Sequence, residues 1–405
     1  MNKSGSKKAV STLLALVCSA SISGNAYALS FSDINSHWAK AGIESAAKEG
    51  LVTGYNGKYL PDAQTSKAEF ASILDRMLHR ADSASVVGLP TSMKTHWSRA
   101  SVENLVRLGV IYNTEASRFI PTGTISRFEM ATWLSRALAT IDPSYADALN
   151  DLKGEAAVIP VSEFFKNKMT MDQNPAVGLM IGTGIMKGLP DGSFGFAKVA
   201  TRAEVAAIAL RFKAVSSKTA DTFSELNELR EVGVTGTNLT SLTPYKFGAP
   251  HGTIKDFSHV RNKTYTMDNG AGKIDIHRML LVDADSNKEV KGVYGKLFIN
   301  ESSDVHKGPH YFGYMQITIT PSINNFTLAK YLQGASGDGI VSGLHISRFS
   351  YDVFGIQGLP QGDWSKFFYK GKPVTFWVSS NFSKNAESEK NYVIKTDDGY
   401  ISIYN

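Results

Sequence analysis

The tetrapeptide S-K-A-E at 66–69 returns as S-R-F-E at 126–129 and as T-R-A-E at 201–204. Each copy keeps its surroundings: a glycine followed by two apolar residues stands 17 or 18 positions before the basic residue, an aromatic residue stands eight before it, and a glutamate stands two after it. The three sets are Gly50, Tyr59, Lys67 and Glu69; Gly109, Phe119, Arg127 and Glu129; and Gly184, Phe194, Arg202 and Glu204. A register of four points held three times predicts an internal repeat.

One repeat is expected to contain an opening helix, a glycine stop, an irregular arm and a second helix. In the first repeat, Ser36-His37-Trp38 precedes apolar residues at helical spacing, and Gly50 lies where glycine commonly closes a helix in the left-handed conformation. The arms at 54–62 and 188–194 are rich in Gly, Pro, Asn and Asp, which predicts turns.

The tetrapeptide has the pattern of a capping box, in which the first side chain caps the helix and the glutamate reaches back to the N–H of the cap residue. The predicted capping residues are Ser66, Glu69, Ser126, Glu129, Thr201 and Glu204. The apolar residues that follow predict the buried face of each second helix: Phe70, Ile73, Leu74 and Met77; Met130, Trp133, Leu134 and Leu138; Val205, Ile208, Ala209 and Phe212.

The basic residue of this pattern needs a separate explanation. Lys67, Arg127 and Arg202 fall in the first turn of a helix, where the positive end of the macrodipole disfavours a cation by roughly 0.3–1 kcal/mol. One explanation is a solvated side chain whose stem covers apolar surface. The other is an anion held jointly by the cation and by free N–H groups at the helix start.

The repeats resemble the S-layer homology family, whose domains usually come in threes. The resemblance rests on F-S-D-I at 31–34, H-W-A at 37–39 and G-L-V-T-G-Y at 50–55, and on G-I-M-K-G-L-P-D-G-S-F at 184–194. The second repeat is less similar, because Pro90 and Ser92 stand where Phe31 and Asp33 stood. The resemblance covers roughly residues 30–213.

The resemblance implies an α-helical, pseudo-threefold triplet of helix–arm–helix repeats with ligand grooves between them. The implied ligand is an anionic secondary cell-wall polymer, often capped by a pyruvate ketal. The residues that match the family's binding positions are Lys67, Arg127, Arg202, Asp33, Trp38 and Trp97. Lys67 replaces the family's arginine. For both tryptophans, the residue type favours core packing over ligand binding.

The third repeat departs from the family at its opening. Asp172 and Gln173 stand where the other repeats have the His-Trp pair, and the opening helix is expected within 163–168 or 175–180. One or two of the three grooves are therefore candidates for being inactive.

The N-terminus predicts export. Residues 1–28 have a basic start, an apolar stretch and Ala26-Tyr27-Ala28, the pattern of a cleaved signal peptide. Cleavage removes the single cysteine, Cys18, and changes the balance from 43 basic and 37 acidic residues to 40 and 37. No basic stripe points to nucleic acid, and no later apolar run is long enough for a membrane span.

The second half predicts a mainly β, sandwich-like domain. A linker is expected at 214–222, a short helix at 223–231, and strands at 273–277, 315–320, 343–349, 374–378 and 400–404, with a hairpin at 280–294 turning at Ser286-Asn287. The predicted domains are a signal peptide at 1–28, repeats at 29–82, 88–142 and 158–213, a linker with a short helix at 214–244, and a β-rich domain at 245–405.

No catalytic or metal constellation emerges in this half. His251, His259, His277, His306, His310 and His345 are expected to be surface or hydrogen-bonded residues. Asp283, Asp285 and Asn287 begin like a calcium loop, but Lys288 and Tyr294 break the pattern. Ser336 lies in a glycine-rich loop without a nucleophile motif. We expect no cofactor, no metal and no catalytic residue.

The sequence therefore favours a secreted, non-catalytic surface protein of a Gram-positive-type bacterium. Its partners would be the secondary wall polymer or peptidoglycan, and an unknown partner of the β-rich domain. A wall-anchored polysaccharide hydrolase and a small S-layer subunit are the alternatives.

Overall fold

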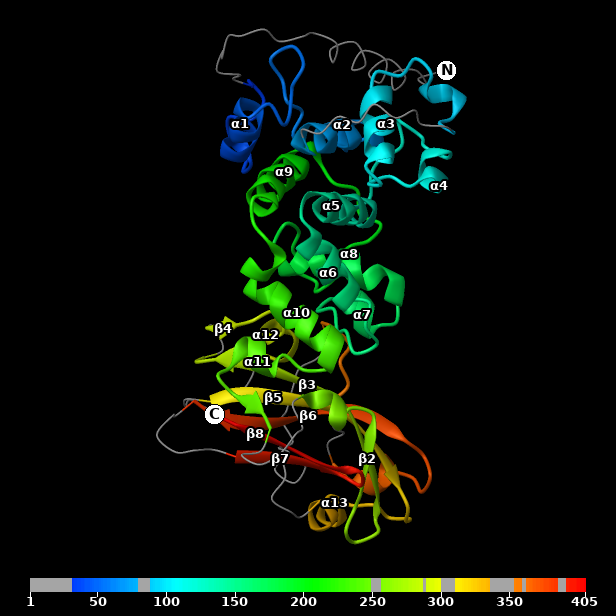
Figure 1. Ribbon diagram of the computed structural model, residues 1–405, viewed down its shortest axis with the longest axis vertical. Helices are drawn as coiled ribbons and strands as arrows, with labels where there is room; N and C mark the ends of the chain where they lie inside the picture. Colours follow the sequence, from blue (N-terminus) through cyan, green and yellow to red (C-terminus); the bar gives the residue numbers. More distant parts are fainter. Residues whose placement is uncertain are drawn as a thin grey trace, which may run out of the picture. The chain divides into compact units, whose positions relative to one another are not determined.

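The computed structural model describes residues 31–78, 88–248, 256–286, 289–299, 310–335, 353–358, 362–384 and 391–405 (Figure 1). The chain divides into two compact units. Unit 1 consists of Met1–Asp147, Gly184–Lys187 and Gly195–Thr219, and unit 2 consists of Ala148–Thr183, Gly188–Phe194 and Ala220–Asn405. The third predicted repeat is thus shared between the two units. The predicted signal peptide lies outside the described residues.

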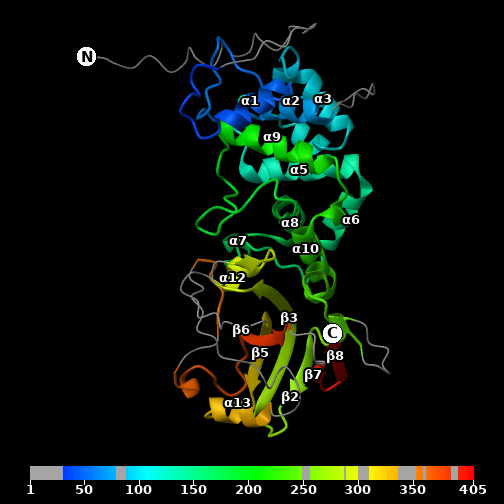
Figure 2. The ribbon, with the colours of Figure 1, turned by 90° about the vertical axis from the view of Figure 1, so that its left-hand side faces the viewer.

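Unit 1 is helical. Its helices are α1 (Lys40–Lys48), α2 (Lys67–Leu78), η2 (Thr91–Met93), α3 (Arg99–Arg107), α4 (Asn113–Ala116), α5 (Arg127–Ile141), the start of α6 (Pro143–Asp151) and α9 (Arg202–Ser216). The three second helices of the repeats are α2, α5 and α9, which pack against one another, while α1 packs on α9 and α3 on α2 (Figures 1 and 2). Every residue of the apolar faces predicted for these three helices is buried, so that prediction is confirmed.

The predicted glycine stops are confirmed as well. Gly50, Gly109 and Gly184 have φ values of 71°, 72° and 71°, in the left-handed region that residues with a Cβ rarely adopt. At the end of α1, the Gly50 N–H donates to the Ala47 carbonyl, and the next N–H donates to Ala46. Glycine therefore turns the chain into the arm while it satisfies the last carbonyls of the helix.

The helical part of unit 2 contains the opening of the third repeat. Its elements are α7 (Ser162–Phe165), η3 (Met171–Gln173), α8 (Asn174–Gly182), η4 (Ala220–Thr222), α10 (Ser224–Thr235), α11 (Leu239–Leu242) and α12 (Gly295–Phe298). Helix α8 packs against α10 so closely that a Cβ added to Gly182 would lie 2.7 Å from the Leu226 Cα. Both segments proposed for the third opening helix, within 163–168 and 175–180, contain helix.

The expected linker at 214–222 differs from the structure. Helix α9 continues to Ser216, and η4 covers 220–222. Val215 is buried and its carbonyl accepts a hydrogen bond of 2.9 Å from the Tyr145 hydroxyl, so tertiary packing holds a segment whose polar composition suggested a loop. The helix expected at 223–231 is present and extends to Thr235, where Gly236 ends it in the left-handed region.

The rest of unit 2 is β-rich, and both of its sheets are antiparallel. The larger sheet has the order β2 (Lys263–Thr266), β3 (Gly272–Ala284), β5 (His310–Pro321) and β6 (Val374–Ser383), with β4 (Val290–Lys291) paired to β3. The smaller sheet has the order β1 (Lys246–Phe247), β8 (Gly399–Tyr404) and β7 (Asn391–Thr396). The remaining elements are η5 (Phe257–His259), α13 (Leu328–Gly334) and η6 (Trp364–Lys366).

The strands predicted at 273–277, 315–320, 374–378 and 400–404 are present, and β3 and β4 form the predicted hairpin. The strand predicted at 343–349 lies outside the described residues. Ile274 and Ile317 of the larger sheet share one apolar core with Ile394 and Ile401 of the smaller one. This shared core is what the expected sandwich-like domain requires.

Unit 2 also buries one carboxylate. Glu228 of α10 is 2% exposed, and its Oε2 accepts a hydrogen bond of 2.9 Å from Asn238 Nδ2. Asn238 also joins α10 to the larger sheet, since its amide pairs with the backbone of Leu281. Burial raises the pKa of Glu228 to about 7, although the Asn238 amide and the Val293 N–H both favour the ionised form.

This carboxylate predicts a pH-dependent stability. Because the folded-state pKa lies above the ordinary value of 4.5, the native state binds more protons than the unfolded state between pH 4.5 and 7. The free energy of unfolding should therefore fall as pH rises through that window, by on the order of 3 kcal/mol. Denaturant titrations at several pH values should show this slope in the wild type and lose it in Glu228→Gln. Glu225→Gln, an exposed change in the same helix, should keep it, and an unchanged slope in Glu228→Gln would contradict the assignment.

Candidate functional site at the repeat junctions

Each second helix of unit 1 begins against the arm of another repeat. In α2, the N–H of Lys67 donates to Gly123 (2.7 Å) and that of Ala68 to Pro121 (3.2 Å), both in the second repeat. The equivalent bonds of α5 run from Arg127 to Lys198 (2.8 Å) and from Phe128 to Phe196 (3.3 Å), and those of α9 from Arg202 to Ala63 and from Ala203 to Pro61 (2.9 Å each). Repeat 1 thus contacts repeat 2, repeat 2 contacts repeat 3, and repeat 3 contacts repeat 1. We call these junctions 1–2, 2–3 and 3–1.

The capping boxes complete these helix starts. Glu69, Glu129 and Glu204 each donate their backbone N–H to the cap hydroxyl at 3.2 Å, from Ser66, Ser126 and Thr201 respectively. Their carboxylates accept from the backbone N–H of those same cap residues at 2.8–3.0 Å. The first three N–H groups of all three helices therefore have partners within the protein. The expectation of free N–H groups that hold an anion is wrong, because the neighbouring arm supplies carbonyls to them.

The basic residues reach across the same junctions. Lys67 Nζ pairs with Glu129 Oε1, and Arg202 Nη1 pairs with Glu69 Oε1 at 2.7 Å. Arg127, which is buried, donates from Nη2 to the Lys187 carbonyl of the third repeat at 2.8 Å. Each paired glutamate therefore uses Oε2 to cap its own helix and Oε1 to bind the preceding repeat. This explains a cation in an unfavourable first turn: Lys67 and Arg202 are paired with the glutamate of the next repeat, and Arg127 donates to a backbone carbonyl of the next repeat.

Arg202 makes further contacts at junction 3–1. Arg202 also donates to the carbonyls of Tyr59 (2.8 Å, from Nε) and Thr53 (2.7 Å, from Nη2), and its guanidinium carbon lies 4.8 Å from the Tyr59 ring centroid. The Tyr59 hydroxyl donates back to the Arg202 carbonyl at 2.8 Å. Burial raises the pKa of Tyr59 to about 12, against the opposing effect of the Arg202 charge, so the hydroxyl remains a donor. Thr53 and Lys187 both stand three residues after the glycine that closes the opening helix. Arg202 and Arg127 therefore donate from Nη2 to equivalent backbone carbonyls.

Asp33 shapes the arm next to this junction. Its carboxylate accepts from the N–H groups of Tyr59 (2.9 Å) and Leu60 (2.8 Å), where Leu60 has a φ of 58°. Burial opposes ionisation, but these N–H groups outweigh it and hold the pKa of Asp33 below its ordinary value of 3.8. Asp33 is thus a structural clamp of the first arm.

The sequence did not reveal the equivalent residue of the third repeat. Glu163 Oε2 accepts from the Phe194 N–H at 2.9 Å, as Asp33 accepts from Tyr59, and both aromatic residues stand eight before the repeat's cation. Glu163 is farther from its cation in sequence than Asp33 is, so a fixed register misses it. The signal that was available is an acidic residue in the short helix that opens the repeat.

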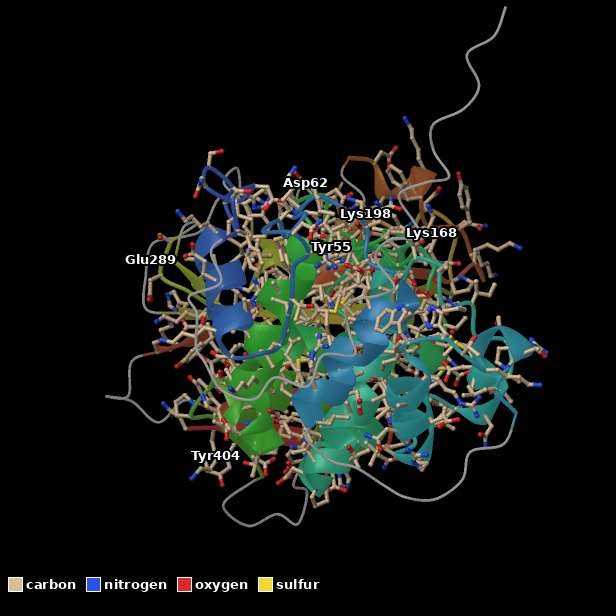
Figure 3. All side chains as sticks on the ribbon, turned by 90° about the horizontal axis from the view of Figure 1, so that it is seen from above. Tyr55, Asp62, Lys168, Lys198, Glu289 and Tyr404 are labelled. Atoms are coloured by element: carbon tan, nitrogen blue, oxygen red, sulfur yellow. The ribbon has the colours of Figure 1, made fainter. Side chains whose placement is uncertain are left out.

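The two tryptophans of the opening motif differ in exposure. Trp38 is 70% exposed, so core packing is wrong for it, whereas Trp97 is half-buried. His37, whose ring lies 5.4 Å from that of Trp38, bonds through Nε2 to Asp62 Oδ1 at 3.2 Å. Asp62 follows Pro61, whose carbonyl belongs to junction 3–1, so the His37 ring lies against the arm that forms this junction. Figure 3 looks onto unit 1 and labels Asp62 and Tyr55 of the first arm.

The third repeat offers no equivalent of Trp38. Eight of the nine residues of α8 are buried, and Asp172 and Gln173 lie in the preceding 3-10 turn, where Gln173 accepts from the Thr170 N–H. The arm of this repeat is also covered, since a Cβ at Gly192 would lie 2.6 Å from a methyl group of Val353. Among the three repeats, only the first two present a His-Trp pair.

Unit 2 shows other partners for the residues considered from sequence. His277 bonds to the Thr318 hydroxyl at 2.7 Å, and Asp283 and Asp285 bind Lys384. Asn287, Ser336, His251, His306 and His345 lie outside the described residues. Within the described ranges, no group of three or more His, Cys, Asp or Glu side chains is placed to hold a metal ion. None of the helices described there has the length and apolar character needed to cross a bilayer.

Comparison with known families agrees with the repeat register. The S-layer homology domain matches residues 30–71, 93–131 and 168–206. The chain therefore carries three S-layer homology repeats, and the C-terminal region matches no family.

Three curated relatives are similar to parts of the chain. A cellulosome-anchoring protein of Acetivibrio thermocellus is 29% identical over 124 residues, which cover 28% of this chain and 27% of the relative. Cell surface glycoprotein 1 of the same organism is 28% identical over 27% of this chain and 5% of its own length. Exoglucanase XynX of that species is 28% identical over 44% of this chain and 16% of its own length. The chain thus spans only a small part of each relative.

The junction geometry predicts unequal effects of removing the cations. Arg202→Ala removes the donor to Glu69 Oε1 and to two carbonyls in a mostly buried site, so unit 1 should lose about 2–4 kcal/mol. Lys67→Ala removes a more exposed pair and should cost about 1 kcal/mol or less. Denaturant unfolding of the full chain measures both, with the exposed Lys198→Ala as control (Figure 3). Equal losses for Arg202→Ala and Lys67→Ala would contradict this account.

The Asp33 clamp predicts an acid sensitivity. A carboxyl whose pKa is lowered on folding contributes stability that is present above its unfolded pKa and is lost as pH falls through the folded pKa. Wild-type unit 1 should therefore lose this contribution below about pH 4. In Asp33→Asn this stabilising contribution should be absent at pH 7. Thermal unfolding should show the stability of the wild type approaching that of Asp33→Asn as the pH falls towards 2. A stability gap that persists at pH 2 would show that charge is not the cause.

Proposed function

We propose that this protein is a cell-surface protein held non-covalently on a bacterial cell wall by its repeats. The repeats bind an anionic secondary wall polymer, and unit 2 is the module that they display. The observation that carries the proposal is Trp38, a large ring left 70% exposed next to His37, whose own ring bonds to Asp62 of the first arm. Two relatives named for anchoring and for the cell surface support the location.

The chemistry of junction 3–1 suits a carboxylate ligand, such as a pyruvate ketal on a sugar. Three of the five N–H groups of the Arg202 guanidinium are used by Tyr59, Glu69 and Thr53, which leaves two in the part of the chain described. An anion that joins the Arg202–Glu69 pair would gain a fixed fork of donors, and Trp38 would pack against the sugar ring. At the other two junctions we propose Lys67 and Arg127 as the cations that correspond to Arg202. Trp97 is the proposed counterpart of Trp38 in the second repeat, and Asp33 supports the first arm.

We also propose that the three repeats surround a pseudo-threefold axis. The cyclic order of the junctions supports this, since each helix start binds the arm of the next repeat and the third returns to the first. Because only the first two repeats present a His-Trp pair, polymer binding is assigned to those two repeats, and the third serves mainly to close the ring.

For unit 2 we propose a non-catalytic role in display or partner binding. The relative named as an exoglucanase supports the alternative, a wall-anchored hydrolase. Incubating the full chain with xylan, cellulose and isolated wall polysaccharide, and measuring the release of reducing ends, separates the two. Release well above a heat-inactivated sample would overturn the non-catalytic assignment.

The anchoring proposal predicts binding that depends on the polymer and on Trp38. The full chain should co-sediment with purified Gram-positive wall sacculi and lose this binding once acid has stripped the secondary polymer. Trp38→Ala should weaken binding at least about tenfold with an unchanged melting temperature, because the exposed ring has few contacts to lose. Tyr400→Ala, which removes a ring 54% exposed on β8, is the matched control and should bind like the wild type.

Two results would contradict the proposal. Sedimentation that survives stripping would show that the secondary polymer is not the ligand. Equal binding by Trp38→Ala and the wild type would remove the assigned contact and leave the repeats without a described site.

A further inference from the structure

A short loop of unit 2 exposes aromatic and basic side chains side by side. Residues 365–373, which we call the aromatic–lysine loop, follow Trp364 of η6 and read S-K-F-F-Y-K-G-K-P. Phe367 is 43% exposed and Tyr369 is 59% exposed, and the three lysines of the loop, Lys366, Lys370 and Lys372, are exposed as well.

Two buried neighbours hold this loop in place. Trp364 and Phe368 are 4% and 1% exposed, and their rings lie 5.1 Å apart in the apolar core. Trp364 also packs on Tyr331 of α13, which lies beside the loop (Figure 2). Because Phe368 points inward, the residues on either side of it are turned outward.

Backbone bonds fix the outward conformation. The Gly371 N–H donates to the Pro321 carbonyl at 2.7 Å, and the Lys372 N–H donates to Tyr369 at 3.0 Å. The Tyr369 hydroxyl donates to the Lys366 carbonyl at 2.9 Å, which holds its ring across the start of the loop. The loop backbone and the Tyr369 ring are thus held by the fold, which preorganises this part of the surface.

The charge of the loop has one sign. From Trp364 to Ser383 the sequence contains three basic residues and no acidic residue. Across the described ranges, no carboxylate lies within ion-pair distance of Lys366, Lys370 or Lys372. The nearest acid in sequence, Asp363, accepts from the N–H and hydroxyl of Ser365 and also interacts with the charge of Lys366, so it offsets part of the charge of the three lysines. Three cations within seven residues therefore produce a local positive field that extends about one Debye length, roughly 8–10 Å.

We propose that the aromatic–lysine loop is a second ligand site of this protein and that it binds an anionic polysaccharide. The rings of Phe367 and Tyr369 would cover the apolar faces of sugar rings, and the lysines would meet carboxylates or phosphates carried by the sugars. The site is separate from the repeats and rests on unit 2 alone. With the repeats bound to the same wall, it would add a second contact at high effective concentration.

The composition favours a glycan over a lipid surface. Only two rings are exposed in the loop, and one of them is fixed by a hydroxyl bond to the backbone, so little apolar area can enter a bilayer. Peripheral membrane binding needs a broader apolar face or a second anchoring signal. A row of flat rings flanked by lysines suits a polymer in which sugars and negative charges alternate.

Affinity electrophoresis of the full chain tests this proposal. Gels contain polygalacturonate as the probe, dextran as the neutral comparison, or no polymer, and the chain carries Trp38→Ala so that the proposed repeat site does not contribute. Two variants change the loop. The ring variant is Phe367→Ser/Tyr369→Ser, and the lysine variant is Lys366→Gln/Lys370→Gln/Lys372→Gln. Lys246→Gln/Lys296→Gln/Lys395→Gln is the matched control, since it removes the same charge from exposed positions elsewhere in unit 2.

The proposal predicts retardation by polygalacturonate and none by dextran. Both loop variants should weaken the apparent affinity at least fivefold and the control less than twofold, with all melting temperatures unchanged. Equal losses in the control and the lysine variant would show a mere effect of net charge and overturn the site. Full retardation of the ring variant would overturn the role of the rings, and tighter binding to phosphatidylglycerol vesicles than to polygalacturonate would assign the loop to membranes instead.

Discussion

The carboxylates of Glu69 and Glu129 each bind two repeats at once, and the organisation of unit 1 depends on this double use. One oxygen caps the helix that contains the glutamate, and the other accepts the cation of the preceding repeat. A glutamate at this position therefore fixes where its own helix starts and also where the preceding repeat lies against it. Burial opposes ionisation of Glu129, but the bonds from Lys67 and Ser126 keep its pKa below the ordinary value.

This constraint moves the expected binding chemistry away from the bare helix ends. The first-turn N–H groups are occupied by carbonyls of the next arm, so the polymer anion of our proposal would meet a cation–glutamate pair and not an open helix terminus. What remains available is at the surface: the Trp38 ring in unit 1 and, independently, the rings and lysines of the aromatic–lysine loop in unit 2. Both proposed sites present an exposed aromatic ring, which can cover the apolar face of a sugar.

The sequence predicted what local rules control and missed what tertiary contacts decide. The repeat register, the left-handed Gly50, the capping at Ser126 and the buried faces of the second helices follow from spacing and turn chemistry, and all are present. The partners of Lys67 and Arg202 lie in other repeats, so no local pattern reveals them. Glu163 was not predicted, because its separation in sequence from the arm residue that it binds differs from that of Asp33. The exposure of Trp38 was not predicted either, because tryptophan buries a large apolar area and its residue type therefore favoured core packing.

Amide hydrogen exchange at the helix starts tests the central claim, that the repeats close on one another through these first turns. The N–H groups of Lys67, Arg127 and Arg202 should all be strongly protected in the full chain, because each donates to a neighbouring arm. Glu69→Gln, which removes the negative charge paired with Arg202, should raise exchange at Arg202 far more than at Arg127. Fast exchange at all three positions in the wild type, comparable to that of solvent-exposed helix ends, would contradict the claim.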